Sequence, residues 1–333
     1  LQTLFEHNLS FRPTMSVQVG QAAPHRAIEA QFTILWVIRQ FVAELLESPI
    51  DVRRRHAVLF CEAAEASVTK GRATVSWQVD QGEDLKAAIH HALEDPELGE
   101  VAVRLVMNCG FLLGQGPIDE YLALLDRAAS RTGPPPWLAA RLELQRFSIA
   151  RMAGIVVPEE EMRRLLDRGD CDEETVIRTL LQISYVRADH DVGSAIEPRQ
   201  LALERARAHG DRRLLAICTE QLGGSWLSLL RFDEAEAALT EALEHYEALG
   251  DATSVGQTLN LLGEVALRTS ANDEARSLFE RACEAATTSG DLPLHVSSLL
   301  QLATVAHLRG DVSEALARCA QARPLAERLG AHA

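Results

Sequence analysis

Histidine and cysteine pairs are the first candidates for metal or nucleophile chemistry in this chain. His90 and His91 are adjacent, so on a helix they point in different directions, whereas residues three or four apart share a face. A zinc site needs further ligands, and the neighbouring sequence offers none. His56 and Cys61 are five residues apart, and His56 has no acid at helical spacing to orient it. We therefore predict no catalytic residue, no metal site and no cofactor, and hence no enzyme.

Two runs of charged residues are the next candidates for a functional site. Residues 159–161 are three glutamates that follow a proline, a pattern typical of a helix start, where acidic side chains interact favourably with the helix dipole. Arg53, Arg54 and Arg55 form a basic run. Taken alone, this run also indicates a solvated helix start.

The six cysteines contain no pair within four residues of each other, so no CxxC metal or redox motif exists. We predict that they are small buried residues of a protein in a reducing, cytoplasmic compartment. They are Cys61, Cys109, Cys171, Cys218, Cys283 and Cys319.

Composition and charge exclude several classes of protein. The 333 residues are 47% hydrophobic and 24% charged, which is ordinary for a folded chain and rules out extensive disorder. No apolar run of ~18 residues occurs, so we expect no membrane-spanning helix. The net charge is −15, although residues 1–60 carry six Arg against five acids. Duplex nucleic acid requires a basic surface, so we expect no direct nucleic-acid binding by the later chain.

A repeat of 40 residues positions whatever site the chain has. Three independent markers share this step: a Gly-Asp pair, an acidic-Ala motif and a Leu-Gly or Leu-Ala pair. The markers are Gly210-Asp211, Gly250-Asp251, Gly290-Asp291 and Gly330; Ala235, Ala275 and Ala315; and Gly223, Gly263 and Ala303. Within one unit, 252–269 and 273–288 have helical spacing of apolar residues. Each unit is therefore predicted to be a helix pair, with Gly290 as a C-cap and Asp251 or Thr253 as an N-cap.

These helix pairs resemble the tetratricopeptide repeat. The pattern is carried by Leu262, Gly263, Ala275, Phe279 and Ala282, although the family's basic repeat of about 34 residues is shorter. The resemblance implies an all-α, right-handed superhelix. We predict about five helix pairs over residues 98–333, clearest at 211–330, with residues 51–97 as a helical linker before them.

The first part of the chain does not follow the repeat. A helix end at 1–7, strands at 9–12 and 31–35, a loop between them and a helix at 36–47 predict the C-terminal part of a winged-helix domain with a small β-hairpin over residues 1–50. The chain starts at Leu1, within an element, so we expect it to be a fragment of a longer protein.

The same region resembles STAND-type bacterial transcription regulators, that is, signal-transduction ATPases with numerous domains, including LuxR-like and antibiotic-regulator-like members. The resemblance rests on the order of five segments: LFEHNL at 4–9, FTIL at 32–35, IRQFVAELL at 38–46, RRRHAVLF at 53–60 and EDLKAAIHHAL at 83–93. In the last segment, an Asp stands where the family pattern suggests Asn.

The resemblance implies a sensor region that controls an ATPase core and a DNA-binding domain elsewhere in the protein. This chain has no GxxxxGK[ST] phosphate loop. Arg53, Arg54 and Arg55 then become candidates for contact with the ATPase core. The signal would be a protein, a peptide or a small-molecule inducer, and self-association is possible.

Tetratricopeptide geometry places the expected binding groove on the first helix of each pair. The predicted groove residues are Glu220, Leu227, Gln257, Asn260, Glu264, Arg268, Thr304 and His307. Two other interpretations stay open: a freestanding repeat scaffold that joins two proteins, and, less favoured, a helical-repeat enzyme.

Overall fold

The computed structural model describes residues 49–68, 81–110, 117–131 and 133–330. Its chain divides into two units, Leu1–His56 and Ala57–Ala333. The predicted hairpin and the helix at 36–47 lie outside the described residues, so the winged-helix assignment stays a prediction. The predicted domain boundaries at residues 50 and 97 also stay predictions.

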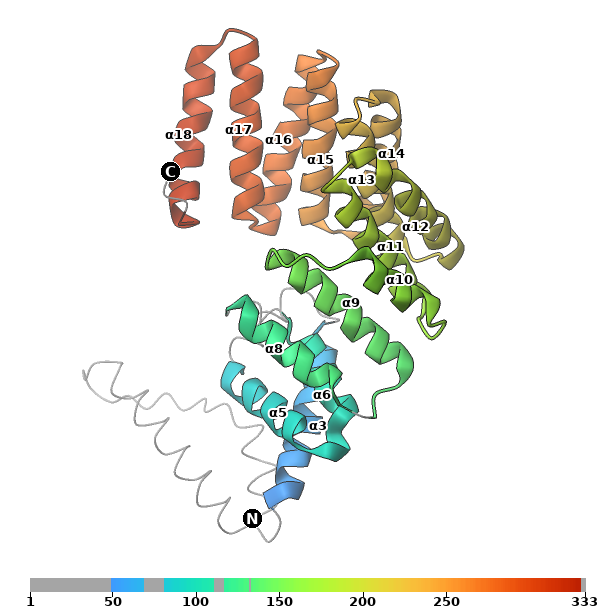
Figure 1. Cartoon of the computed structure of the whole chain (residues 1–333). Helices are drawn as coiled ribbons and strands as arrows, with labels where there is room; N and C mark the ends of the chain where they lie inside the picture. Colours follow the sequence, from blue (N-terminus) through green and yellow to red (C-terminus); the bar gives the residue numbers. More distant parts are fainter. Residues whose placement is uncertain (1–48, 69–80, 111–116, 132, 331–333) are drawn as a thin grey trace, which may run out of the picture. The chain divides into compact units, whose positions relative to one another are not determined.

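Every described element is a helix, so the described part of the chain is all-α (Figure 1). The α-helices are α3 Pro49–Val68, α5 Gly82–Glu94, α6 Gly99–Asn108, α8 Ile118–Ala129, α9 Pro136–Met152, α10 Glu159–Asp167, α11 Glu173–Ala188, α12 Ile196–His209, α13 Arg212–Ser228, α14 Phe232–Leu249, α15 Ala252–Arg268, α16 Asn272–Ser289, α17 Leu292–Leu308 and α18 Val312–Arg328. Two short 3-10 helices, η1 Pro96–Leu98 and η2 Val192–Ala195, complete the set.

Consecutive helices pack as antiparallel pairs, and the pairs α13/α14, α15/α16 and α17/α18 lie side by side in Figure 1. The predicted pair at 252–269 and 273–288 is confirmed by α15 and α16. An earlier pair within the predicted repeat region consists of α9 and α10, which the residues around Val157-Pro158 connect. The right-handed turn of the superhelix stays a prediction.

The Gly-Asp markers are the junctions between pairs. Gly290 has φ +69°, the left-handed conformation that ends α16 without strain for a residue lacking Cβ. The next residue, Asp291, accepts a hydrogen bond from the Leu294 backbone N–H at 3.0 Å and caps α17. Asp251 caps α15 in the same way, through the Ser254 N–H at 3.3 Å. One dipeptide thus ends one helix and begins the next, which explains the strict 40-residue step.

The small residue of the Leu-Gly marker lies where the two helices of a pair come closest. A Cβ built on Gly263 would come within 2.5 Å of the Phe279 ring, so nothing larger than hydrogen fits without a shift of that buried ring. Gly263 therefore contacts Phe279, another residue that carries the tetratricopeptide pattern.

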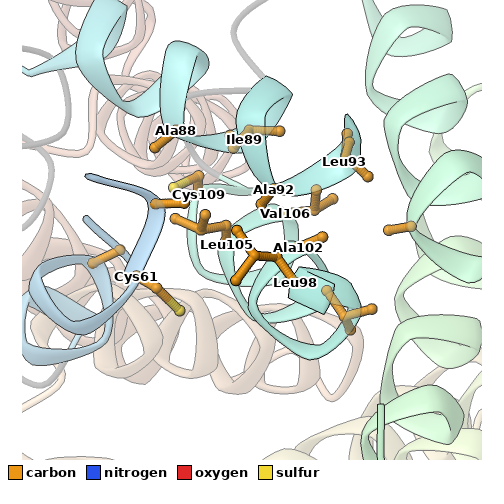
Figure 2. Packing of buried hydrophobic residues seen from close by; sticks show 14 of the residues in the cluster. Cys61, Ala88, Ile89, Ala92, Leu93, Leu98, Ala102, Leu105, Val106 and Cys109 are labelled. Atoms are coloured by element: carbon orange, nitrogen blue, oxygen red, sulfur yellow. The ribbon is translucent and has the colours of Figure 1, made fainter. Parts of the chain in front are cut away.

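A separate hydrophobic cluster lies at the start of the Ala57–Ala333 unit. It joins side chains of α3, α5, α6 and α8, among them Ile89, Leu93, Leu105 and Val106 (Figure 2). The part of α3 from Ala57 onwards and α5 therefore share a core with α6 and α8.

Burial of the cysteines varies along the chain. Cys61 and Cys109 belong to the cluster in Figure 2, and burial raises the pKa of each thiol to about 12. Cys218 is also buried, whereas Cys171 and Cys283 are partly buried. Cys319 is exposed, so the expectation of burial was wrong for it: α18 is the last described helix, and no later described pair covers it.

Candidate partner-binding groove

The first helices of the last three pairs line an open groove of about 580 Å³. Its walls come from α13, α15 and α17, and four of the predicted site residues line it: Glu220, Gln257, Asn260 and Glu264. We call this cavity the α13–α17 groove. Gln257, Asn260 and Glu264 follow one another at three- and four-residue steps along α15, so the helix places them on one face.

Glu220 is the most enclosed charge in the α13–α17 groove. The Tyr246 hydroxyl donates a hydrogen bond to Glu220 Oε2 at 2.9 Å, and Thr258 Oγ1 lies 3.3 Å from Oε1. Burial raises the pKa of the Glu220 carboxyl; the two hydrogen bonds oppose this shift and the Asp251 carboxylate adds to it. The site therefore holds an acid that takes up a proton more readily than an exposed glutamate does.

Asn260 connects two walls of the groove. Its Oδ1 accepts a hydrogen bond from the Ser298 hydroxyl of α17 at 3.1 Å. Glu264 lies one turn further along α15 and forms an ion pair with Arg268 at 3.2 Å. Gln257 is exposed, so its amide is available to a ligand.

The charged side chains that line the groove are all acidic. Glu220, Glu264 and Asp291 line it, and no Lys, Arg or His does. Asp291 also holds the N-terminus of α17, which partly neutralises its charge.

The groove has six further lining residues that were not predicted from the sequence. They are Leu261, Asp291, Pro293, Leu294, Ser297 and Gln301. A sequence signal existed for one of them, because Ser297 lies one 40-residue step after Gln257, a predicted groove residue. Pro293 and Leu294 have no such signal, since they belong to the first turn of α17, which closes the groove.

Four predicted residues lie elsewhere. Arg268 is exposed and touches the groove only through Glu264. Thr304 and His307 are exposed on α17, beyond the last lining residue, Gln301. The placement of Leu227 in the groove was wrong: only 7% of its surface is exposed, because α14 and α15 pack over the end of α13 and include Leu227 in their shared hydrophobic cluster.

The basic run lies on the first turns of α3. Arg53 and Arg55 are exposed, and Arg54 is partly buried. Their contact with an ATPase core stays a prediction.

Within the described ranges, no group of three or more His, Cys, Asp or Glu side chains gathers in a way that would hold a metal ion. The same ranges contain no helix with the length and apolar character needed to cross a membrane.

Residues 216–288 match the family model described as "Tetratricopeptide repeat", which covers α14 and α15 with most of α13 and α16. No curated protein sequence matches the chain.

Two solved structures have the same type of fold. One is a Rap protein complexed with competence and sporulation factor: the identity is 16%, the TM-score 0.55, and the match covers 80% of this chain and 77% of that one. The other is a signal transduction ATPase with numerous domains (STAND) protein with a tetratricopeptide repeat sensor, from Pyrococcus horikoshii. There the identity is 14%, the TM-score 0.51, and the match covers 88% of this chain but 55% of that one. Similarity at this level shows the helical-repeat fold.

Proposed function

We propose that this chain is a partner-binding sensor region that recognises a protein or peptide segment in the α13–α17 groove. The observation that carries the proposal is the groove itself: first helices of three consecutive pairs line one cavity of about 580 Å³, to which α13 and α15 present Glu220, Gln257, Asn260 and Glu264. A volume in this range suits a ligand of several side chains. Tetratricopeptide repeats generally bind protein or peptide partners, which is consistent with this role.

The polar lining provides the means of recognition. A partner that fails to match a buried polar group leaves it without a hydrogen bond, at a cost of about 1–3 kcal/mol. Glu220 is the group for which this matters most, because it lies deepest. Since three carboxylates and no basic side chain line the groove, we expect a segment that carries Lys or Arg to bind better than an acidic one.

In the finer form of the proposal, the chain is the sensor part of a STAND-type transcription regulator. Partner binding in the α13–α17 groove would release an ATPase core located elsewhere in the protein, and Arg53, Arg54 and Arg55 would contact that core. The similarity in fold to a STAND protein with a tetratricopeptide repeat sensor and the order of the motifs at residues 4–93 support this form. The alternative is a freestanding scaffold that binds its partner in the same groove.

The binding proposal is tested by selecting, from a displayed library of random peptides, those that bind the 333-residue chain. We expect enrichment of peptides with Lys or Arg. The double variant Gln257→Ala with Glu264→Ala should weaken their binding at least tenfold. A matched control changes one neutral and one acidic residue on exposed positions of α16, Ser277→Ala with Glu284→Ala, and should leave binding unchanged. Selection of peptides that ignore the first pair, or that depend on the second, would overturn the proposal.

The sequence of the gene upstream of Leu1 separates the two forms. A GxxxxGK[ST] motif there would favour the regulator. With such a motif, Arg53→Ala together with Arg55→Ala should alter ATP turnover of the full protein without changing peptide binding. An upstream region with no nucleotide-binding module would favour the scaffold.

A further inference from the structure

One side of α18 carries exposed apolar side chains. In Figure 1, α18 has α17 on one side and no described helix on the other. Val312 and Leu316 are 57% and 66% exposed, and Cys319 and Ala320 are exposed as well. The steps of three and four residues between them place these side chains on one side of the helix. We call these four residues the α18 face.

The preceding pair shows what three of these positions do inside the repeat. On α16, Arg276 forms an ion pair with Glu314 of α18 at 3.1 Å, and Glu280 lies 3.9 Å from Arg318 of the same helix. Between them in the sequence, Phe279 is fully buried in a cluster with side chains of α17. These positions of a second helix therefore face the next helix pair.

One 40-residue step later, α18 has Leu316, Cys319 and Ala320 at these positions. The two charges are replaced by apolar side chains and the aromatic ring by a small thiol. On α17, Leu300 is 47% exposed at the position of Asn260, whose amide oxygen accepts a hydrogen bond from the next first helix. A further helix pair of the same kind would lack these ion pairs, this hydrogen bond and the aromatic contact, so the α18 face suits a different, apolar partner.

Charge along α18 selects a second copy of the same helix as that partner. Asp311 caps the start of α18, Arg328 lies in its last turn, and both are exposed. If two copies of α18 lie antiparallel, with a two-fold axis between Cys319 and Ala320, Asp311 of each copy comes beside Arg328 of the other, where opposite charges attract. The small side chains at the axis allow the two helices to approach closely.

The other charged side chains of α18 are compatible with this arrangement. Glu314 and Arg318 are already paired with each other at 3.3 Å. Glu327 would lie beside the first turn of the other α18, where the helix dipole favours a carboxylate. Arg323 would lie opposite Leu316, where its aliphatic stem can cover apolar surface while its charged group stays in water.

We propose that two copies of this chain associate through their α18 faces, antiparallel about a two-fold axis. Two-fold symmetry is the commonest arrangement of identical chains, and it brings the same surface of both copies together. The α18 face shares no residue with the lining of the α13–α17 groove, so association and partner binding are separate properties.

Sedimentation velocity of the 333-residue chain tests the association. Between about 1 and about 200 µM, the range of moderate to weak affinity, the mass should rise from one copy towards two. Leu316→Arg gives α18 the residue that α16 has at the same position, and Leu316 is exposed, so the fold should tolerate it. The variant should raise the dissociation constant at least tenfold, because the new charge faces Arg323 of the other copy in an apolar contact.

Gln321→Arg is the matched control. It also introduces the residue of α16 at the same position, Arg281, but at an exposed site away from the α18 face. The dissociation constant should not change. Both variants should keep the melting temperature of the parent protein at a concentration where single copies dominate.

A short bis-maleimide, which joins two thiols, tests the position of the axis. Among the six cysteines, only Cys319 is exposed, and the two Cys319 side chains should be linked across the axis. Cys319→Ser should abolish the cross-linked dimer and leave the sedimentation result unchanged. Arg328→Ala tests the direction: antiparallel helices lose the contact with Asp311, so association should weaken about twofold to fivefold, whereas parallel helices would place the two Arg328 side chains together and gain from their removal.

Four results would overturn the proposal. They are a mass of one copy over the whole concentration range, a dimer that Leu316→Arg leaves intact, a dimer without a Cys319 cross-link, and stronger association of Arg328→Ala. The first is also the result expected if a further helix pair or another protein covers the α18 face instead. Peptide binding in the α13–α17 groove is measured with different variants, so failure of one proposal leaves the other standing.

Discussion

The early helix pairs and the late ones use the same design with different local means. In the late pairs, α13, α15 and α17 each begin with an aspartate whose side chain accepts a backbone N–H. Among the earlier first helices, α11 has the same kind of cap at Asp172, but α9 begins directly after Pro135 and no side chain caps it. Proline supplies a helical φ but no hydrogen-bond acceptor. A repeat can therefore keep its helices while it loses the motif that makes it visible in sequence.

Packing within the pairs differs in the same way. The late pairs bring their helices together at Gly223 and Gly263, where an added Cβ would overlap Leu239 or Phe279. The early pairs bury large side chains such as Tyr121, Phe147 and Met162, as the late pairs bury Phe279 and Tyr246, but their first helices α9 and α11 contain no glycine. Close approach requires a small residue at a fixed position, whereas a large side chain can be accommodated at several. The 40-residue period is therefore strict after residue 210 and loose before it.

The two cavities extend the comparison to binding. Both use the first helices, but the cavity between α9, α11 and α13 has Arg141 and Arg178 beside Glu174 in its lining, while the α13–α17 groove has Glu220, Glu264, Asp291 and no basic residue. Repeated helices thus set where a side chain points and leave its charge free to vary.

The largest expected effect concerns the early pairs. Phe147 is 2% exposed and packs between α9, α10 and α11, so Phe147→Ala should cost about 3–5 kcal/mol through lost burial and a cavity. Met152, on the same helix, is 67% exposed, and Met152→Ala should cost little. Thermal unfolding followed by far-UV circular dichroism measures both. Equal melting temperatures for the two variants would show that the early pairs do not depend on their large buried side chains.

The corresponding test in the late pairs is overpacking. Gly263→Leu should cost about 1–3 kcal/mol or more, because the new side chain must displace the Phe279 ring. Gly224→Leu is the control, since an added Cβ there meets nothing within 4 Å, and the loss of a helical glycine is favourable.

A second substitution sharpens this test. If the clash with Phe279 is the cause, Phe279→Leu should be less harmful in the Gly263→Leu background than in the parent protein. A double-mutant cycle in thermal or urea unfolding measures the coupling. Strictly additive effects would argue against a direct contact between the two positions.

Loss of a cap is expected to be a smaller effect. Asp211 Oδ1 accepts the Leu214 N–H at 2.8 Å, and Asp211→Ala should destabilise the protein by about 1 kcal/mol. Asp211→Asn keeps the acceptor and should be close to neutral. Pro135→Ala, at the start of α9, removes no side-chain acceptor and should lower the melting temperature less than Asp211→Ala does. The reverse order would break the distinction between the two kinds of helix start.

The smallest expected effect is a pH dependence at Glu220. Burial raises the pKa of this carboxyl in the folded state, so the folded chain holds its proton more tightly than the unfolded chain does. The stability linked to this group is then fully present below the ordinary carboxyl pKa of about 4.3 and is lost as the pH rises through the raised folded-state value.

Glu220→Gln removes this titration. The variant should melt at a higher temperature than the parent protein at pH 8, and the difference should shrink as the pH falls towards 4. Tyr246 and Asp251 are the other titratable groups that act on Glu220, and both are unchanged in the variant. A difference in melting temperature that is constant over this range would show that the carboxyl keeps an ordinary pKa.

Much of the late region could be predicted from the sequence by itself. The helix pair at α15 and α16, the cap at Asp251, the helix end at Gly290 and the contact of Gly263 with Phe279 all follow from residues that act on the nearby backbone or on a partner helix at a fixed distance along the chain. Glycine conformation, capping hydrogen bonds and helical spacing are local properties, so the sequence determines them.

Only the tertiary structure decided which side chains on those helices reach a cavity. Leu227 is buried because two other helices cover it, and Thr304 and His307 lie outside the groove because its α17 wall ends at Gln301. Gln182 Oε1 is buried without a hydrogen-bond partner in the described part of the chain. Ser148, 34 residues earlier, accepts a hydrogen bond from Gln182 Nε2 and cannot donate to Oε1, because its own proton is used within α9. Burial and hydrogen-bond satisfaction depend on every group packed around an atom, and helical spacing gives the direction of a side chain without giving its neighbours.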